Sequence, residues 1–197
     1  PRLSSAASDV YKRQYQMSKI FGEFYGNYYL KQHNLPFVKA RFQNVYGPGE
    51  ILGAGQWRGT QHTIWRNVTP SLIWKALNNT PLSLDNGGET TRDFIYVEDI
   101  AEGLIACALN GVPGGVYNLA SGKETKIKEL AEKIIQYTNS KSTLELLPKR
   151  DWDNSGRRFG ETEKSEKEIG FKCNTDIDEG LKRTVEWTIA HKGIIPV

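Results

Sequence analysis

Aromatic and aliphatic side chains recur at helical spacing over residues 15–33. Asn34 and Pro36 favour an end to this helix, because proline cannot continue it. Beyond it, strand-like runs at 37–42, 82–84, 93–97, 115–120 and 144–147 alternate with helical patterns at 70–77, 98–109, 127–137 and 175–192, and a short helix ends near 170. This alternation of strands and helices predicts an α/β fold.

Local signals mark where some of these elements begin. Thr125 is placed to cap the helix of 127–137, and Thr175 with Asp178 resembles a capping box for the last helix. Between the first strand and Pro70, the Gly-rich stretch 44–67 predicts a long loop. A loop of this length within a compact domain is usually functional or disordered.

The composition narrows the class of protein. Of 197 residues, 38% are hydrophobic and 25% charged, as in ordinary globular proteins, and the net charge is only +3. Because the Lys and Arg residues are dispersed, no nucleic-acid partner is expected. No apolar run approaches the roughly 20 residues that span a bilayer, so no membrane partner is expected either. Cys107 and Cys173 suggest reduced thiols in a cytoplasmic protein, and the spacing of His33, His62 and His191 predicts no metal site.

Tyr15 and Lys19 carry the strongest chemical signal. Side chains four residues apart lie on one face of a helix. The ammonium of Lys19 can there favour the ionised form of the tyrosine, which makes it a base able to take a proton from an alcohol. The spacing alone occurs by chance in many helices, where it means a packed aromatic residue beside a surface lysine.

Three further motifs follow in a fixed order. The run 41–49 ends a strand, and ligands of open α/β sheets bind beyond the carboxyl ends of strands. Arg92 enters the strand 93–97 from a Gly-rich turn, and a guanidinium can bind a diphosphate through two hydrogen bonds. Arg157 and Arg158 lie in a loop rich in Arg and Gly. Taken singly, each motif also has a plainer interpretation. The run 41–49 fits an ordinary strand-to-loop turn, and Arg92 fits a surface salt bridge with Asp93. Arg157 and Arg158 fit a solvated basic loop.

Taken together, the four motifs resemble the NAD-dependent epimerase/dehydratase family, the extended short-chain dehydrogenases/reductases that act on nucleotide sugars. The resemblance runs from Tyr15 to the last helix. It implies the C-terminal half of an extended Rossmann-type, doubly wound fold, in which the N-terminal nucleotide-binding half is absent. Over 15–197, the C-terminal part of the Rossmann-type domain would be interleaved with a smaller α/β substrate-binding domain, made mainly of 48–92 and 143–192.

Residues 1–14 lack apolar periodicity, and we interpret them as a non-native segment, since 9–14 match what a common sequencing adaptor encodes. A genuine flexible terminus is the alternative. No Gly-x-x-Gly-x-x-Gly turn follows a strand and opens a helix in this sequence. The chain is therefore expected to lack most of the NAD site and to be inactive alone.

The resemblance also implies a role for each matching residue. Tyr15 and Lys19 would be the catalytic pair, Tyr15 taking the proton of a sugar hydroxyl and Lys19 holding the nicotinamide ribose. The expected NAD-binding residues are Tyr15, Lys19, Phe42, Asn44 and Val45, with Gln43 at the same strand end. The expected substrate-binding residues are Asn44, Asn67, Val68, Arg92 and Arg158, the last in a motif that carries Glu161 where the family has Asp.

The expected function is that of an NAD-dependent nucleotide-sugar 4-epimerase, in which a sugar hydroxyl is transiently oxidised and the hydride returns to the other face. A 4,6-dehydratase or a decarboxylase remains an alternative, as does a non-catalytic dinucleotide-sensing or scaffold protein. The substrate would be a nucleotide-diphosphate sugar, and the full-length protein a homodimer through the helix of Tyr15. The segment 55–63 bears either on sugar choice or on a surface or subunit contact.

Overall fold

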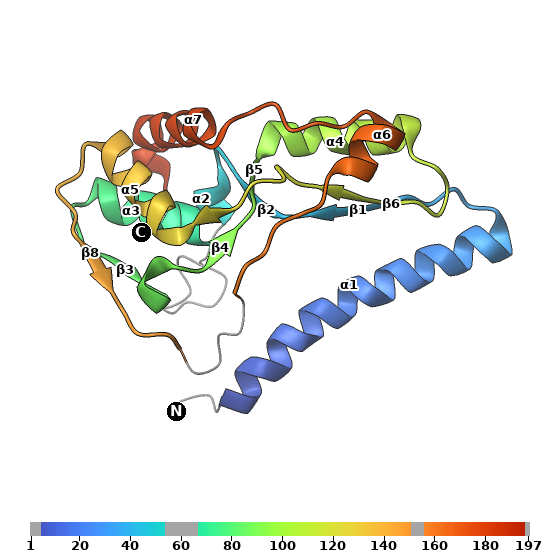
Figure 1. The fold of residues 1–197 in the computed structure, drawn as a ribbon, viewed down its shortest axis with the longest axis horizontal. Coiled ribbons are helices and arrows are strands. Elements are labelled where there is room, and N and C mark those ends of the chain that lie inside the picture. The colour runs from blue at the N-terminus through green and yellow to red at the C-terminus, as the bar shows by residue number, and fades with distance from the viewer. Residues whose placement is uncertain (1–4, 54–66, 151–155, 196–197) are drawn as a thin grey trace.

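The computed structural model describes residues 5–53, 67–150 and 156–195, with side chains from residue 14 onward. A long helix, α1 (Ser5–His33), projects from the rest of the fold (Figure 1). Its C-terminal half is held by the segment that follows it. Arg41 Nη2 lies 2.7 Å from Glu23 Oε2, and Lys39 Nζ donates to Asn27 Oδ1 at 2.7 Å. The helix starts at Ser5, so it includes much of the segment 1–14, whose origin stays a prediction.

The strands of the described chain form pairs, three parallel and one antiparallel. The parallel pairs are β1 (Lys39–Phe42) with β6 (Val116–Leu119), β2 (Asn44–Tyr46) with β5 (Phe94–Tyr96), and β3 (Leu82–Leu84) with β8 (Leu144–Leu146). The antiparallel pair is β4 (Thr91–Arg92) with β7 (Thr125–Lys126). Between β1 and β2 the chain changes partner, because Gln43 N donates to Leu119 O and Asn44 N donates to Asp93 O. Residues 43 and 44 therefore lie where two strand pairs diverge.

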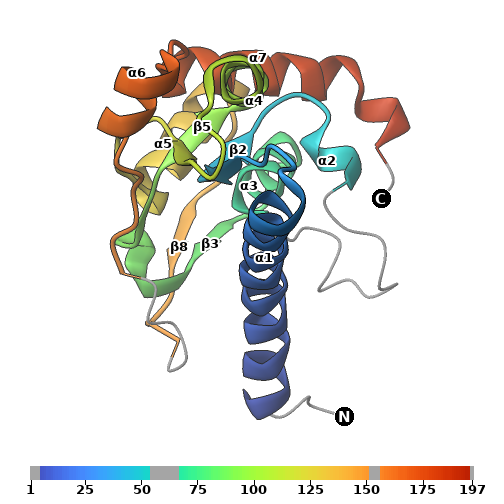
Figure 2. The same cartoon turned by 90° about the vertical axis from the view of Figure 1, so that its right-hand side faces the viewer.

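Helices pack against the strand pairs (Figures 1 and 2). They are α2 (Glu50–Gly53), α3 (Val68–Leu77), α4 (Val97–Asn110), α5 (Ile127–Thr138), α6 (Glu163–Ile169) and α7 (Ile177–Ala190), with the 3-10 turns η3 (Asp85–Gly88) and η4 (Lys192–Ile194). This mixed α/β arrangement with parallel strands confirms the expected fold class. Within the described part, none of the helices is both long and apolar enough to cross a membrane.

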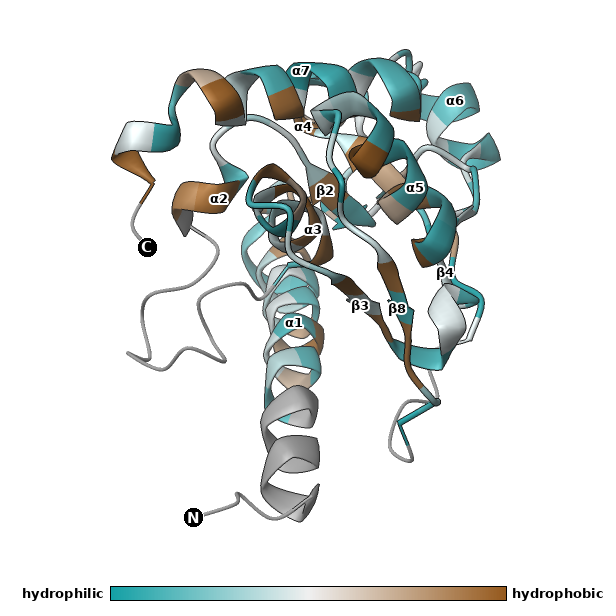
Figure 3. Ribbon diagram, turned by 90° about the vertical axis from the view of Figure 1, so that its left-hand side faces the viewer, coloured by the Kyte–Doolittle hydropathy of each residue, from teal (hydrophilic) through white to brown (hydrophobic). Residues whose placement is uncertain are grey.

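Two apolar clusters form the core. The first joins α3, β3, α5 and α7 through fully buried residues such as Ile73, Leu82, Leu130 and Leu181. Figure 3 shows the apolar positions of α3, β3 and β8 that belong to this part of the fold. The second cluster, which includes Ile95, Tyr117, Leu119 and Phe171, joins the central strands to α4 and α6. The fold therefore has two apolar cores.

One predicted loop contains regular structure. The stretch 44–67, expected to be a long loop, includes β2 and α2. The short strand β2 is fixed by its pairing with β5, in which Val45 lies opposite Ile95. Local pattern does not show such a distant partner, which explains the error. The segment 55–63 lies outside the described residues.

Both predicted helix caps are wrong by one residue. Thr125 is buried in β7, and Lys126 occupies the N-cap of α5. The cap of α7 is Asp176, whose Oδ1 accepts from the backbone N–H of Asp178 at 2.9 Å. The spacing of Thr175 and Asp178 imitates a capping box, but the aspartate between them makes the bond.

Candidate active site

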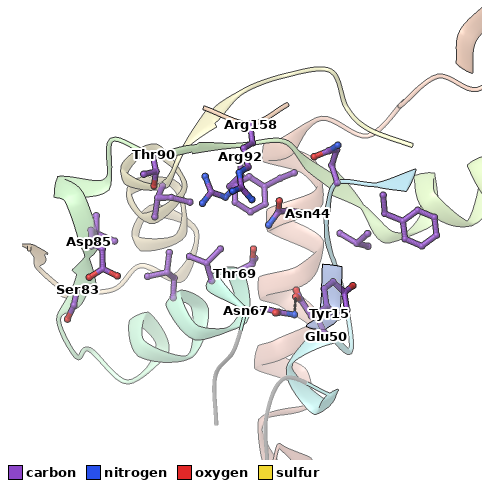
Figure 4. A pocket seen from close by; sticks show the side chains of 18 residues that line it. Tyr15, Asn44, Glu50, Asn67, Thr69, Ser83, Asp85, Thr90, Arg92 and Arg158 are labelled. Carbon is purple, nitrogen blue, oxygen red and sulfur yellow. Dashed lines mark hydrogen bonds between the residues drawn. The ribbon is translucent and has the colours of Figure 1, made fainter. Parts of the chain in front are cut away.

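A cavity of about 860 Å³ lies where the β1–β2 junction, α3, β4 and the N-terminal half of α1 contribute side chains (Figure 4). All but one of the predicted site residues line it: Tyr15, Phe42, Asn44, Val45, Asn67, Val68, Arg92 and Arg158, together with Gln43. These residues come from widely separated parts of the chain. The predicted roles require these residues to lie around one cavity, and they do. The roles themselves stay predictions.

Lys19 is the predicted residue that does not line the cavity. Its Nζ lies 5.1 Å from the centroid of the Tyr15 ring, so the two side chains share one face of α1 as expected. The Tyr15 side chain is 64% exposed, which leaves it accessible to a ligand. Helix spacing alone thus places a cation beside a phenol at the edge of the cavity.

The basic wall of the cavity is made of two arginines. Arg92 Nη1 donates to the carbonyl oxygens of Thr91 at 2.6 Å and Gly156 at 3.3 Å, which fixes the guanidinium in place. Arg158 lines the cavity, whereas the neighbouring Arg157 pairs with Glu124 through an Nε–Oε2 distance of 3.0 Å. The two adjacent arginines therefore differ: Arg158, which the sequence motif selected, lines the cavity, and Arg157 is paired with Glu124.

The N-terminus of α3 adds further anion-binding groups. Val68 and Thr69, in the first turn of this ten-residue helix, line the cavity. Asn67 is the N-cap residue, but its side chain makes no capping bond. The amide N–H groups of a first helical turn lack partners within the helix and attract anions. With the two arginines, this helix end suits a diphosphate.

Asp93 is a supporting residue that sequence reasoning missed. Asp93 is fully buried, which contradicts the alternative interpretation of a surface salt bridge between Arg92 and Asp93. One carboxylate oxygen accepts from Ser121 N at 2.9 Å and Ser121 Oγ at 2.7 Å, and the other from Gly122 N at 3.0 Å and Gly160 N at 3.1 Å. Asp93 thereby ties the loop of Arg158 to the central strands. A charged residue at the start of an apolar strand is the signal that could have found it.

Glu50 also lines the cavity, and no motif pointed to it. Its Oε1 accepts a hydrogen bond from Asn67 Nδ2 at 2.8 Å. Burial raises the pKa of this carboxyl to about 7, although the bond from Asn67 acts in the opposite direction. In the described part of the chain, no group of three or more His, Cys, Asp or Glu side chains is placed to hold a metal ion.

Residues 3–120 match the NAD dependent epimerase/dehydratase family. The chain belongs to this family. Its fold is accordingly of the family's Rossmann-type α/β class, and the family's cofactor is NAD, as expected from the sequence.

The chain also resembles individual proteins. The Bordetella bronchiseptica enzyme WbmF, solved in complex with NAD+ and UDP, is 65% identical with a TM-score of 0.83, over 92% of this chain and 54% of that chain. A UDP-N-acetylglucosamine 4-epimerase of Methanobrevibacter ruminantium M1, in complex with UDP-N-acetylmuramic acid, is 30% identical with a TM-score of 0.72, over 86% and 51%. Human dTDP-D-glucose 4,6-dehydratase is 30% identical over 88% of this chain and 47% of its own length.

The chain spans about half the length of the relatives it matches. Among relatives of the family, the named activities include epimerases, 4,6-dehydratases and a decarboxylase. The relatives are therefore NAD-dependent nucleotide-sugar enzymes as a class, without agreement on one reaction.

Proposed function

We propose that the complete protein carrying this chain is an NAD-dependent nucleotide-sugar 4-epimerase. One observation carries the proposal: Tyr15, Asn44, Asn67, Arg92 and Arg158 line a single cavity. Its volume of about 860 Å³ falls within the range of about 300–1,000 Å³ that is usual for small-molecule sites. The likeness to WbmF, solved with UDP, supports a uridine nucleotide as the ligand.

The cavity has two chemically different ends that fit the two parts of such a ligand. In Figure 4, Arg92 and Arg158 lie together, away from Glu50 and Asn67. We place the diphosphate between the arginines and the N-terminus of α3, and the sugar toward Tyr15. The assignment of 48–92 and 143–192 to a substrate-binding part is kept as a proposal, supported by the pairing of β3 with β8 within the first apolar cluster.

The chemistry assigned to this chain is proton transfer. Tyr15 takes the proton of a sugar hydroxyl as the alcohol becomes a ketone, and returns it when the ketone is reduced. Lys19, whose Nζ lies 5.1 Å from the centroid of the Tyr15 ring, would hold the ribose beside the tyrosine. Bound NAD would supply the redox chemistry, by accepting a hydride from the sugar carbon and giving it back. Phe42, Asn44 and Val45 would hold the nicotinamide end, since they line the adjoining wall.

Product analysis tests the reaction. The complete protein is incubated with NAD and, in separate samples, UDP-glucose, UDP-N-acetylglucosamine or UDP-glucuronate, and the products are identified by proton NMR. Inversion at C4 supports the epimerase. Loss of water to a 4-keto-6-deoxy sugar would show the dehydratase, and release of carbon dioxide from UDP-glucuronate the decarboxylase. NAD binding without turnover of any sugar would favour a sensor or scaffold.

Arg92→Ala is expected to weaken UDP binding about 10- to 100-fold, because it removes a charged donor from the diphosphate. Isothermal titration of UDP into the complete protein measures the effect. Arg158→Ala should act in the same direction, whereas Arg157→Ala is the matched control, since Arg157 pairs with Glu124. Equal losses in the Arg92 and Arg157 variants would contradict the placement of the diphosphate.

We further propose that the complete protein is a homodimer through α1. This helix exposes a row of large apolar side chains, Phe21, Phe24, Tyr25 and Tyr28, each between 53% and 66% exposed. Such a row on one helix is typical of an interaction face. Analytical ultracentrifugation should give the mass of a dimer at micromolar concentration, and a monomer would contradict the proposal.

A further inference from the structure

Arg41 and Glu23 form an ion pair between β1 and α1 through two hydrogen bonds. Arg41 Nε donates to Glu23 Oε1 at 2.8 Å, and Arg41 Nη2 donates to Glu23 Oε2 at 2.7 Å. One guanidinium therefore engages both oxygens of the carboxylate. The two side chains are 55% and 31% exposed, and exposed ion pairs usually contribute little to stability. The neighbours of this pair on α1 indicate another effect.

Glu23 lies one helical turn beyond Lys19, and Lys19 lies one turn beyond Tyr15. Side chains at this spacing share one face of a helix, so Lys19 has an aromatic ring on one side and a carboxylate on the other. Opposite charges four residues apart on a helix attract each other. Lys19 Nζ nevertheless lies 5.1 Å from the centroid of the Tyr15 ring, while Glu23 pairs with Arg41. Arg41 thus engages the carboxylate that would otherwise attract Lys19 away from the tyrosine.

The charge of Glu23 agrees with this arrangement. The hydrogen bonds from Arg41 hold the pKa of the Glu23 carboxyl below its ordinary value. Glu23 would also be ionised without Arg41, because the ordinary pKa of a glutamate lies well below neutral pH. Removal of Arg41 alone would therefore leave an unpaired carboxylate one turn from Lys19. Removal of both charges would leave none.

We propose that Arg41 is a positioning residue for Lys19. By holding both oxygens of Glu23, Arg41 leaves the Lys19 ammonium free to bind the ribose of NAD. The inference rests on the proposed function, which gives Lys19 that contact. It extends the function by giving a role to an ion pair that does not line the cavity.

NAD binding, measured apart from turnover, tests the inference. The complete protein is freed of bound nucleotide, and isothermal titration gives its dissociation constants for NAD and for UDP. Arg41→Ala is expected to weaken NAD binding about threefold, because the unpaired carboxylate of Glu23 attracts Lys19. UDP affinity should change by less than about 1.5-fold, since the arginines of the diphosphate are untouched. In the double variant Arg41→Ala/Glu23→Gln most of the NAD affinity should return, because no carboxylate competes for Lys19.

Two further variants calibrate the experiment. Lys19→Ala removes the proposed ribose contact and should weaken NAD binding about tenfold or more. Asn27→Ala is the matched control, because it removes the other side-chain bond between α1 and β1, donated by Lys39 Nζ at 2.7 Å, without changing any charge. It should leave NAD affinity unchanged.

Unchanged NAD binding in Arg41→Ala would overturn the inference. A loss that persists in the double variant would also overturn it, as would an equal loss in Asn27→Ala, because either result means that the pair only holds the helix in place. If Lys19→Ala binds NAD as tightly as the unaltered protein, the proposed contact of Lys19 fails and the inference with it. If the NAD affinities change as expected but no sugar is turned over, the inference stands while the proposed reaction fails.

Discussion

Tyr15→Phe is expected to lower kcat of the complete protein about 10²- to 10⁴-fold, because it removes the group that takes and returns the proton of the sugar hydroxyl. The phenyl ring is retained, so the affinity for UDP-sugar should change by less than about threefold. Steady-state kinetics and isothermal titration measure the two effects. A large fall in kcat without a fall in affinity is the signature of an interaction made mainly in the transition state.

Tyr29→Phe is the control for this experiment, since Tyr29 lies on the same helix, is 46% exposed and does not line the cavity. It should leave kcat unchanged. Turnover by the Tyr15 variant within about twofold of the unaltered protein would remove the tyrosine from the proposed mechanism. A protein that binds NAD with or without the Tyr15 hydroxyl, and never turns over, would support the sensing alternative.

Asp93→Ala is expected to lower the free energy of unfolding by about 3 kcal/mol or more, because it leaves buried backbone donors without an acceptor. Those donors are the N–H groups of Ser121, Gly122 and Gly160. Urea denaturation followed by circular dichroism measures the loss. Because Asp93 also anchors the loop of Arg158, UDP affinity should fall in the folded variant.

Glu98→Ala provides the comparison for Asp93. Glu98 forms an exposed pair with Arg183 at 3.3 Å, and such pairs contribute at most about 1 kcal/mol. Asp93→Asn retains one acceptor oxygen, so its loss of stability should lie between those of the other two variants. Losses of the same size in Asp93→Ala and Glu98→Ala would mean that the buried network adds little to stability.

Corrections to the sequence-based expectations share one physical reason. The N-caps of α5 and α7 are Lys126 and Asp176 instead of the two threonines, since β7 and the chain before α7 decide where each helix begins. β2 escaped notice because a three-residue strand depends on its partner β5 for its hydrogen bonds. Short elements fixed by distant partners leave little local periodicity to detect.

The sequence by itself determined the family, the α/β class and the residues expected to act. Those signals are local: Tyr15 and Lys19 share a helix face through their spacing, and Arg92 and Arg158 stand in short motifs whose order along the chain is specific. Tertiary structure alone decided which side chains meet. It paired Arg157 with Glu124, and it buried the Asp93 carboxylate, which accepts from the backbone N–H groups of Ser121, Gly122 and Gly160. Contacts of this kind join residues far apart in the chain, and burial and hydrogen bonding, which no local pattern encodes, select among them.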